Sequence, residues 1–381
     1  MNNTSRPAKM PLIRIAKRDN LSRKYKVLLY IAAILFALLV GSLLLLALGA
    51  DPVEFFGDLL TIGLVKSRFP YKNIESYIKI FVPLLITSLA LSMAFKMKFW
   101  NIGGEGQFIT GAIVAAWVGI ISEGNMSSGA TVFIMALCGG VAAGIYGMLT
   151  AILRVKFGTN ETLMTLMLNY IALYVLKFFG ETKGDWNIFL RSDSTRPVFR
   201  VIPENAWMPA IQMGKFRLNI SLIIALLLAV FIAFYLKKTK HGYEISVVGD
   251  SISTAKYAGM KVGKIIVRTI FFSAFLIGVA GAFHVSTSTS LSISITNDVG
   301  WTGIIVAWLA KLEPLGIFIT SVLIGILQYG CQVASTNFTR LDTNFANLLQ
   351  SIILFSVLAV DFFIRFKVVI NKKPKKEEET K

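Results

Sequence analysis

The sequence has little charge, and this scarcity excludes an ordinary water-soluble protein. Only 16% of its 381 residues are Asp, Glu, Lys or Arg, against roughly 25% in typical soluble chains. Hydrophobic residues account for 55% of the chain without counting glycine, and the mean hydropathy is +0.67. Because so little polar surface cannot cover a globule, we expect the lipid bilayer to be the solvent of most of the chain.

Cysteine and histidine are also scarce, with two residues of each. Both cysteines lie in apolar runs and form no disulfide framework. His241 and His284 have no Cys, Asp or Glu at ligand spacing, so we expect neither a metal site nor a catalytic triad. The stretch from Gly259 to Ile265 resembles a phosphate loop but is one residue short, and isoleucine replaces the required Ser or Thr. We therefore predict no enzyme, no catalytic residues and no cofactor bound directly.

Long apolar runs dominate what remains, and they predict an all-α integral membrane protein with about ten transmembrane helices. The third and eighth runs are short and begin beside glycine clusters, which leaves open whether these two cross the membrane fully. We divide the chain into a basic leader (1–26), a transmembrane domain (27–366) and a charged tail (367–381). The predicted spans are 27–49, 77–95, 106–121, 130–153, 163–179, 220–236, 265–286, 301–312, 315–333 and 346–366.

The net charge of +18 is distributed unevenly between the two sides of the predicted membrane. Ten spans place both termini on one side, and that side carries 27 of the 39 basic residues. Because lysine and arginine are enriched in cytoplasmic loops, we predict that both termini are cytoplasmic. The surplus is then an orientation signal, and no nucleic acid partner is expected.

Two predicted loops are long enough to bind a partner. The external loop, about 181–217, contains three prolines and two tryptophans and is a candidate docking surface for a protein outside the cell. The internal loop, about 237–264, is basic. From charge alone it is either a plain linker or a binding element.

The stretch from Asn101 to Gln107 is the strongest polar cluster within the spans. Three glycines in four residues break the helix there, which is tolerated at membrane depth only where the backbone is enclosed by protein or faces water. Either the cluster is functional, or it is a loop in which Glu105 caps the following helix. Asn169 lies in mid-span, where an interhelical hydrogen bond and a role in a solute path explain it equally well.

A second break, from Asn297 to Gly303, repeats the order of asparagine, glycines and a short apolar run. The chain enters this second break from the face of the membrane opposite to that of the first break. Paired glycine-broken helices predict two pseudo-symmetric halves around a path at the membrane midplane.

These motifs resemble the permease subunits of bacterial ABC importers of the branched-chain amino acid and monosaccharide group, and within it the nucleoside importers. The resemblance runs through most of the chain from Asn101 to Gly316. It rests on five stretches, 101–107, 159–171, 242–259, 273–282 and 303–316.

The resemblance implies a permease in the bacterial cytoplasmic membrane that works with several partners. These are a second, related permease in a heterodimer, two ATP-binding subunits that use the ATP, and an external substrate-binding lipoprotein. It also implies that the internal loop couples the permease to the ATPase, with small residues fitting a groove on that partner. The implied coupling residues are Gly249, Asp250, Ala255, Lys256 and Gly259.

A nucleoside is uncharged and carries one stackable ring with several hydroxyls, so its path needs amides and aromatic rings more than charges. The residues predicted to supply them are Asn101, Glu105, Gln107, Phe108, Asn169 and Trp301. A monosaccharide or branched-chain amino acid permease is the alternative within the family. A stand-alone ion-coupled carrier is the alternative from another class.

Overall fold

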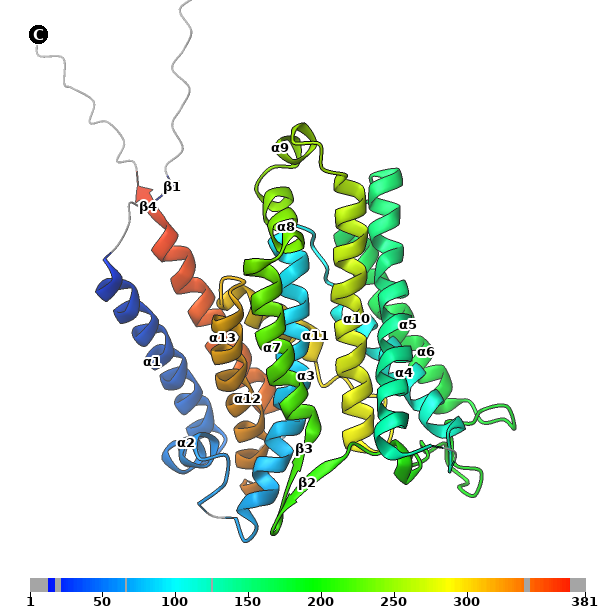
Figure 1. Ribbon diagram of the computed structural model, residues 1–381. Coiled ribbons are helices and arrows are strands. Elements are labelled where there is room, and N and C mark those ends of the chain that lie inside the picture. Colours follow the sequence, from blue (N-terminus) through cyan, green and yellow to red (C-terminus); the bar gives the residue numbers. More distant parts are fainter. Residues whose placement is uncertain (1–12, 18–21, 66, 125, 339–342, 371–381) are drawn as a thin grey trace, which may run out of the picture. The chain divides into compact units, whose positions relative to one another are not determined.

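The computed structural model describes residues 13–17, 22–65, 67–124, 126–338 and 343–370, and they are mostly helical (Figure 1). Within these ranges, nine helices are long and apolar enough to cross a membrane. They are α1 (Arg23–Ala47), α3 (Pro70–Lys96), α4 (Gly104–Ile121), α5 (Ser128–Phe157), α6 (Glu161–Glu181), α7 (Ile220–Lys238), α10 (Val262–Ser288), α12 (Pro314–Asn337) and α13 (Thr343–Arg365).

Each of these helices coincides with one predicted apolar run, and local signals fix the ends. α6 begins after Asn160, whose side chain accepts hydrogen bonds from the N–H groups of Thr162 and Leu163. α5 ends at Phe157 because the next residue, Gly158, adopts the left-handed conformation of a helix cap (φ 66°). α3 begins at Pro70, seven residues before the predicted run, because a proline in the first turn needs no hydrogen bond to its nitrogen.

The eighth predicted span does not form a full crossing. α11 (Val299–Leu309) has 11 residues, about 16 Å at 1.5 Å per residue, which is half the thickness of the hydrocarbon layer. The expected ten spans are thus nine candidate spans plus this half-length helix among the described residues. Beyond the end of α11, Lys311 and Leu312 take left-handed conformations (φ 54° and 60°), which turn the chain before α12.

Strands and short helices also modify the all-α prediction. β1 (Ile13–Lys17) pairs antiparallel with β4 (Phe366–Ile370), and β2 (Ala210–Met213) pairs antiparallel with β3 (Phe216–Asn219). Hydropathy misses these pairs because they are short and lie outside the apolar runs. The remaining helices are α2 (Pro52–Leu60), α8 (Lys240–Asp250), α9 (Ile252–Tyr257) and the 3-10 turn η1 (Glu204–Ala206).

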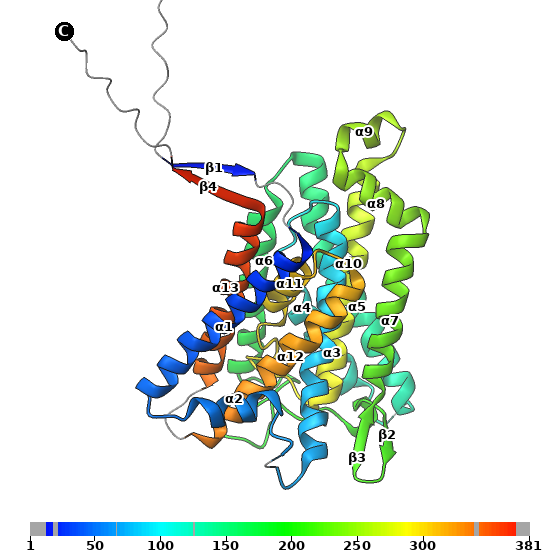
Figure 2. The same ribbon diagram turned by 90° about the vertical axis from the view of Figure 1, so that its left-hand side faces the viewer.

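The chain forms two compact units, 1–56 with 335–381 and 57–334. In the first unit α1 packs against α13, and the β1–β4 ladder joins their ends (Figure 2). The hydroxyl of Tyr30 in α1 donates to Asp361 in α13 (2.9 Å), and Phe55 and Phe345 lie edge to face at 5.8 Å. The described ends of the chain therefore lie at the same end of this unit.

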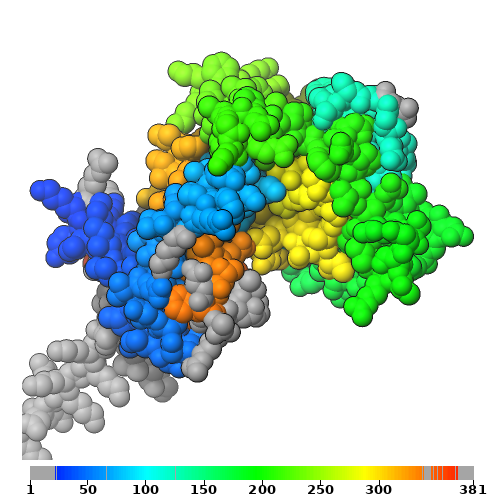
Figure 3. Space-filling model, turned by 90° about the horizontal axis from the view of Figure 1, so that it is seen from below, coloured from blue at the N-terminus to red at the C-terminus, as the bar shows by residue number. Residues whose placement is uncertain are grey.

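In the second unit α10 packs against α3, α4 and α5. Small residues allow this approach, because a side chain at Gly278 would lie 2.5 Å from the carbonyl oxygen of Gly139. α8 and α9 lie at one end of this bundle and β2 and β3 at the other (Figure 1). Seen from the β2–β3 end, yellow residues of the region around the end of α10 are visible between the blue start of α3 and the green segment between α6 and α7 (Figure 3).

Candidate translocation site at two broken helices

Two helices of the second unit begin inside the bundle, and their first turns meet. Residues 97–103 lead from α3 to the start of α4, and residues 289–298 lead from α10 to the start of α11. A side chain at Gly104 would lie 3.3 Å from the Cα atom of Gly300, and one at Gly300 would clash with the backbone nitrogen of Glu105. Only glycine allows the two helix starts to approach so closely.

Glu105 links the two helices through its carboxylate. Its Oε1 atom accepts hydrogen bonds from the backbone N–H groups of Gly300 (3.0 Å) and Trp301 (3.4 Å), and the residue is only 6% exposed. A carboxylate is favoured at the positive end of a helix, where the first N–H groups have no partner. Glu105 lies in the first turn of α4, but its hydrogen bonds are made to the start of α11.

Three buried amide side chains hold the break before α4. Asn101 and Gln107 pair reciprocally, with the Asn101 amide donating at 3.2 Å and the Gln107 amide donating at 3.0 Å. Asn169 of α6 accepts from the N–H of Gly106 (2.8 Å) and donates to the carbonyl of Ile102 (2.8 Å). The two Asn169 bonds satisfy backbone groups that a continuous helix would satisfy itself, and the Asn101–Gln107 pair satisfies two buried amides.

The structure thus brings four of the six predicted path residues together, Asn101, Glu105, Gln107 and Asn169. In this conformation their polar atoms bind one another and the backbone. Phe108 is fully buried on α4, with its ring centroid 5.9 Å from that of His284 on α10. Of the six, only Trp301 is exposed, with 40% of its surface accessible.

Removing the Asn169 amide is expected to destabilise the break. Asn169→Ala leaves the buried N–H of Gly106 without a partner, at a cost of roughly 1–3 kcal/mol, and also removes the bond to the half-buried carbonyl of Ile102. We expect a lower midpoint of thermal unfolding in detergent. Asn219→Ala is the matched control, because Asn219 precedes α7 without a capping hydrogen bond from its side chain. Equal melting temperatures for the two variants would contradict this role.

Beside the break, α11 presents an aromatic face that the sequence patterns identify only in part. Trp308 follows Trp301 by seven residues, or two helical turns, and so lies on the same face. Its ring stacks on Trp100, with centroids 5.3 Å apart and planes inclined by 17°. Trp100 and Trp308 are 47% and 38% exposed. The seven-residue spacing was the signal that could have revealed Trp308, whereas nothing local could have revealed the contact with Trp100.

Polar groups also lie exposed at the start of α11. Asn297 and Asp298 both have left-handed backbones (φ 44° and 58°) and exposed side chains. Irregular backbone with polar side chains is not stable against lipid and needs protein or a water-filled cavity beside it. This segment and the tryptophan face of α11 together form the candidate site.

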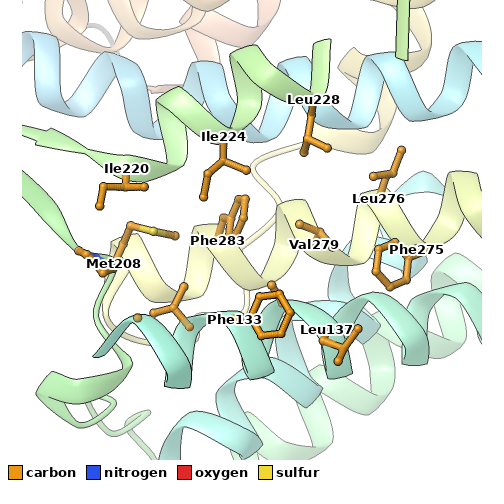
Figure 4. Close-up of a pocket in the computed structure, with 14 residues that line it drawn as sticks. Phe133, Leu137, Met208, Ile220, Ile224, Leu228, Phe275, Leu276, Val279 and Phe283 are labelled. Carbon is orange, nitrogen blue, oxygen red and sulfur yellow. The ribbon is translucent and has the colours of Figure 1, made fainter. Parts of the chain in front are cut away.

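The cavity between α5, α7 and α10 is a poor alternative for a polar solute. It has a volume of about 450 Å³, and its lining side chains are apolar throughout (Figure 4). Phe133, Phe275 and Phe283 are among them. Nothing in this lining replaces the hydrogen bonds that a hydroxylated solute makes with water.

The internal loop predicted to couple to an ATPase folds into α8 and α9. Gly249 and Ala255 are buried, whereas Asp250, Lys256 and Gly259 are exposed. A side chain at Gly249 would clash with the carbonyl oxygen of Lys96 at the end of α3. In the structure these two small residues therefore pack within the chain.

Ion pairs connect α8 and the neighbouring loops to the spans. Arg268 of α10 donates to Glu244 of α8 (2.8 Å), and this bond holds the pKa of the Glu244 carboxyl below its usual value. Because a lowered pKa keeps the carboxylate ionised, the pair persists at neutral pH and is lost only on acidification. Glu313, after α11, pairs with Lys237 at the end of α7 (3.0 Å) and lies 4.0 Å from Lys96.

The nine candidate spans among the described residues, together with the site of broken helices, define a multi-pass membrane protein of the transporter class. The chain belongs to the family described as the permease component of the branched-chain amino acid transport system, whose model matches residues 73–358. Proteins of this kind are transport components and not enzymes. No solved structure matches the chain.

Three relatives illustrate what the chain is similar to. The nucleoside ABC transporter permease protein NupB of Lactococcus lactis is 30% identical, covering 93% of this chain and 97% of the relative. The guanosine ABC transporter permease protein NupP of Bacillus subtilis is 27% identical, covering 78% and 83%. The glucose ABC transporter permease protein TsgB13 of Haloferax volcanii is 24% identical, covering 89% of each.

Proposed function

We propose that this protein is the permease subunit of an ABC importer and forms the membrane path for nucleosides. The observation that carries the proposal is the exposed face beside the broken helices, which combines Trp301, Trp308 and Trp100 with the polar groups of Asn297 and Asp298. A nucleoside has an aromatic base that stacks on such rings and hydroxyls that need polar partners. The names of two of the relatives, nucleoside and guanosine permeases, support this solute class.

Five of the six path residues then support the site, and one contacts the solute. Asn101, Gln107 and Asn169 hold the break in shape, and Glu105 fastens α4 to α11. Trp301 contacts the solute directly, together with Trp308. Phe108 supports the rear of α4 against α10. In this proposal α4 and α11 are the corresponding broken helices of two pseudo-symmetric halves.

The partners and orientation follow the same proposal. α8 and α9 dock on one of two ATP-binding subunits, with Asp250, Lys256 and Gly259 on the exposed side. Tyr257, which is 96% exposed at the end of α9, is an aromatic anchor of the kind that contributes strongly to interfaces. We further propose that α8, α9 and both termini lie in the bacterial cytoplasm, because the predicted cytoplasmic side carries 27 of the 39 basic residues. The segment between α6 and α7 then faces a substrate-binding lipoprotein, and a second, related permease completes a heterodimer.

Trp301→Ala and Trp308→Ala test the solute path. Stacking on an aromatic side chain contributes about 1–3 kcal/mol per base, so we expect each change to reduce nucleoside uptake by reconstituted vesicles about tenfold. Trp301→Phe and Trp308→Phe should retain most uptake because they keep a ring. The matched control is Trp117→Ala, on α4, which is also exposed (49%). Unchanged uptake in both alanine variants, with the control equally active, would contradict the proposed path.

A further inference from the structure

A cavity of about 640 Å³ lies between the end of α5 and the start of α10, at the end of the bundle that carries α8 and α9 (Figure 1). It is distinct from the broken-helix site, and its walls differ in chemistry. One part of the lining is apolar, with Met148, Val155 and Phe271. The other part is formed by Lys261, Lys264 and Arg268, which line the cavity almost entirely with side-chain carbon atoms, so that their charged groups lie at its open edge; we call these three residues the basic wall.

The positive charge of the basic wall is only partly balanced. Arg268 pairs with Glu244, whereas no acidic side chain among the described residues forms an ion pair with Lys261 or Lys264. Both lysines are exposed. The first turn of α10 contains no acidic residue, so these cations lie at the positive end of a helix dipole, where they are unfavourable. An anion in the cavity would relieve this repulsion.

The apolar wall defines what kind of anion fits. A soluble phosphate would use the lysines and leave Met148, Val155 and Phe271 uncovered. A phospholipid with an anionic headgroup uses both walls, since its phosphate meets the lysines while an acyl chain covers the apolar side chains. Basic pockets between membrane helices are suited to such headgroups. The cavity of Figure 4 makes the contrast clear, because its apolar lining offers no charge to a headgroup.

We propose that this cavity binds an anionic phospholipid, with Lys261 and Lys264 on the headgroup phosphate and Met148 beside an acyl chain. The lipid joins the end of α5 to the start of α10. The proposal does not depend on which solute the protein transports, because neither wall includes a residue of the broken-helix site.

Native mass spectrometry of the purified full chain tests this proposal. Phosphatidylglycerol is titrated against phosphatidylcholine with the same acyl chains. We expect tight binding of phosphatidylglycerol to the natural chain and about thirtyfold weaker binding to the double variant K261Q/K264Q, because each basic contact contributes about a factor of five. The matched control K238Q/K240Q removes two exposed lysines that do not line the cavity and should bind phosphatidylglycerol normally. Melting temperatures measured without lipid confirm that all variants are folded.

A second variant separates a lipid from a free phosphate group. Met148→Gln keeps the side-chain length but removes apolar contact, so it should weaken phosphatidylglycerol binding several-fold and leave soluble glycerol phosphate binding unchanged. Equal binding of the two lipids, equal losses in K261Q/K264Q and K238Q/K240Q, or glycerol phosphate binding as tightly as the lipid would each overturn the proposal. Binding of an acidic peptide to Lys261 and Lys264 in place of the lipid would also overturn the proposal.

Discussion

Glu105→Ala is expected to reduce nucleoside uptake at least tenfold and to lower the melting temperature. The change removes the acceptor shared by the N–H groups of Gly300 and Trp301. These groups then remain without a partner in a buried junction, at roughly 1–3 kcal/mol for each. Since this carboxylate fastens the start of α11 to α4, its loss separates the two broken helices. Uptake by vesicles and thermal unfolding in detergent measure the two effects.

Glu105→Gln distinguishes the hydrogen bond from the charge. Its amide oxygen can still accept from Gly300, so we expect a folded protein that loses only the interaction of a charge with the helix dipole, about 0.3–1 kcal/mol. Glu181→Ala, an exposed acid at the end of α6, is the control for loss of a carboxylate. If Glu105→Ala and Glu181→Ala had the same melting temperature and the same nucleoside uptake, Glu105 would not have this role at the junction.

Gly249→Ala is expected to uncouple ATP hydrolysis from transport. The added methyl group would clash with the carbonyl oxygen of Lys96 and lie 3.3 Å from the Cα atom of Met97, so α8 must move away from the end of α3. The residues that follow Met97 form the break before α4. A displaced α8 therefore no longer transmits its position to the site, and we expect nucleoside-stimulated ATPase activity in the assembled transporter to fall at least tenfold.

Gly57→Ala is the matched control for this effect. Gly57 is also within a helix, α2, but a methyl group there would meet nothing within 4 Å. Alanine is favoured over glycine in a helix by roughly 0.5–1 kcal/mol, so a loss of activity at Gly249 cannot come from helix propensity. Normal stimulation in Gly249→Ala, with all subunits still co-purifying, would show that this contact does not transmit the signal.

Hydropathy and glycine patterns predicted most of the fold because both reflect local chemistry. Apolar runs locate each long helix, and the glycines around Glu105 and Gly300 locate both breaks. The short eighth run left open whether α11 crosses fully, and hydropathy could not decide it because it does not register the left-handed turns at Asp298 and Lys311. Nor could the β1–β4 ladder be predicted, since it joins residues from opposite ends of the sequence.

The sequence predicted most residues of the candidate site, but it did not predict which hydrogen bonds they form. Sequence left open whether Glu105 caps its own helix, and the structure shows it bound to the start of α11. It also left open the role of Asn169, which forms interhelical hydrogen bonds. Each answer depends on residues more than 60 positions apart, for which a single sequence carries no signal. The same holds for Gly249, whose neighbour Lys96 belongs to another helix.

Uptake of labelled guanosine by vesicles that contain the chain with its co-purified partners tests the central claim most directly. We expect uptake that requires ATP and the external binding protein, and that other nucleosides compete for while glucose and leucine do not. Transport by the purified chain without ATP or partners, or competition by leucine or glucose in place of nucleosides, would contradict the account.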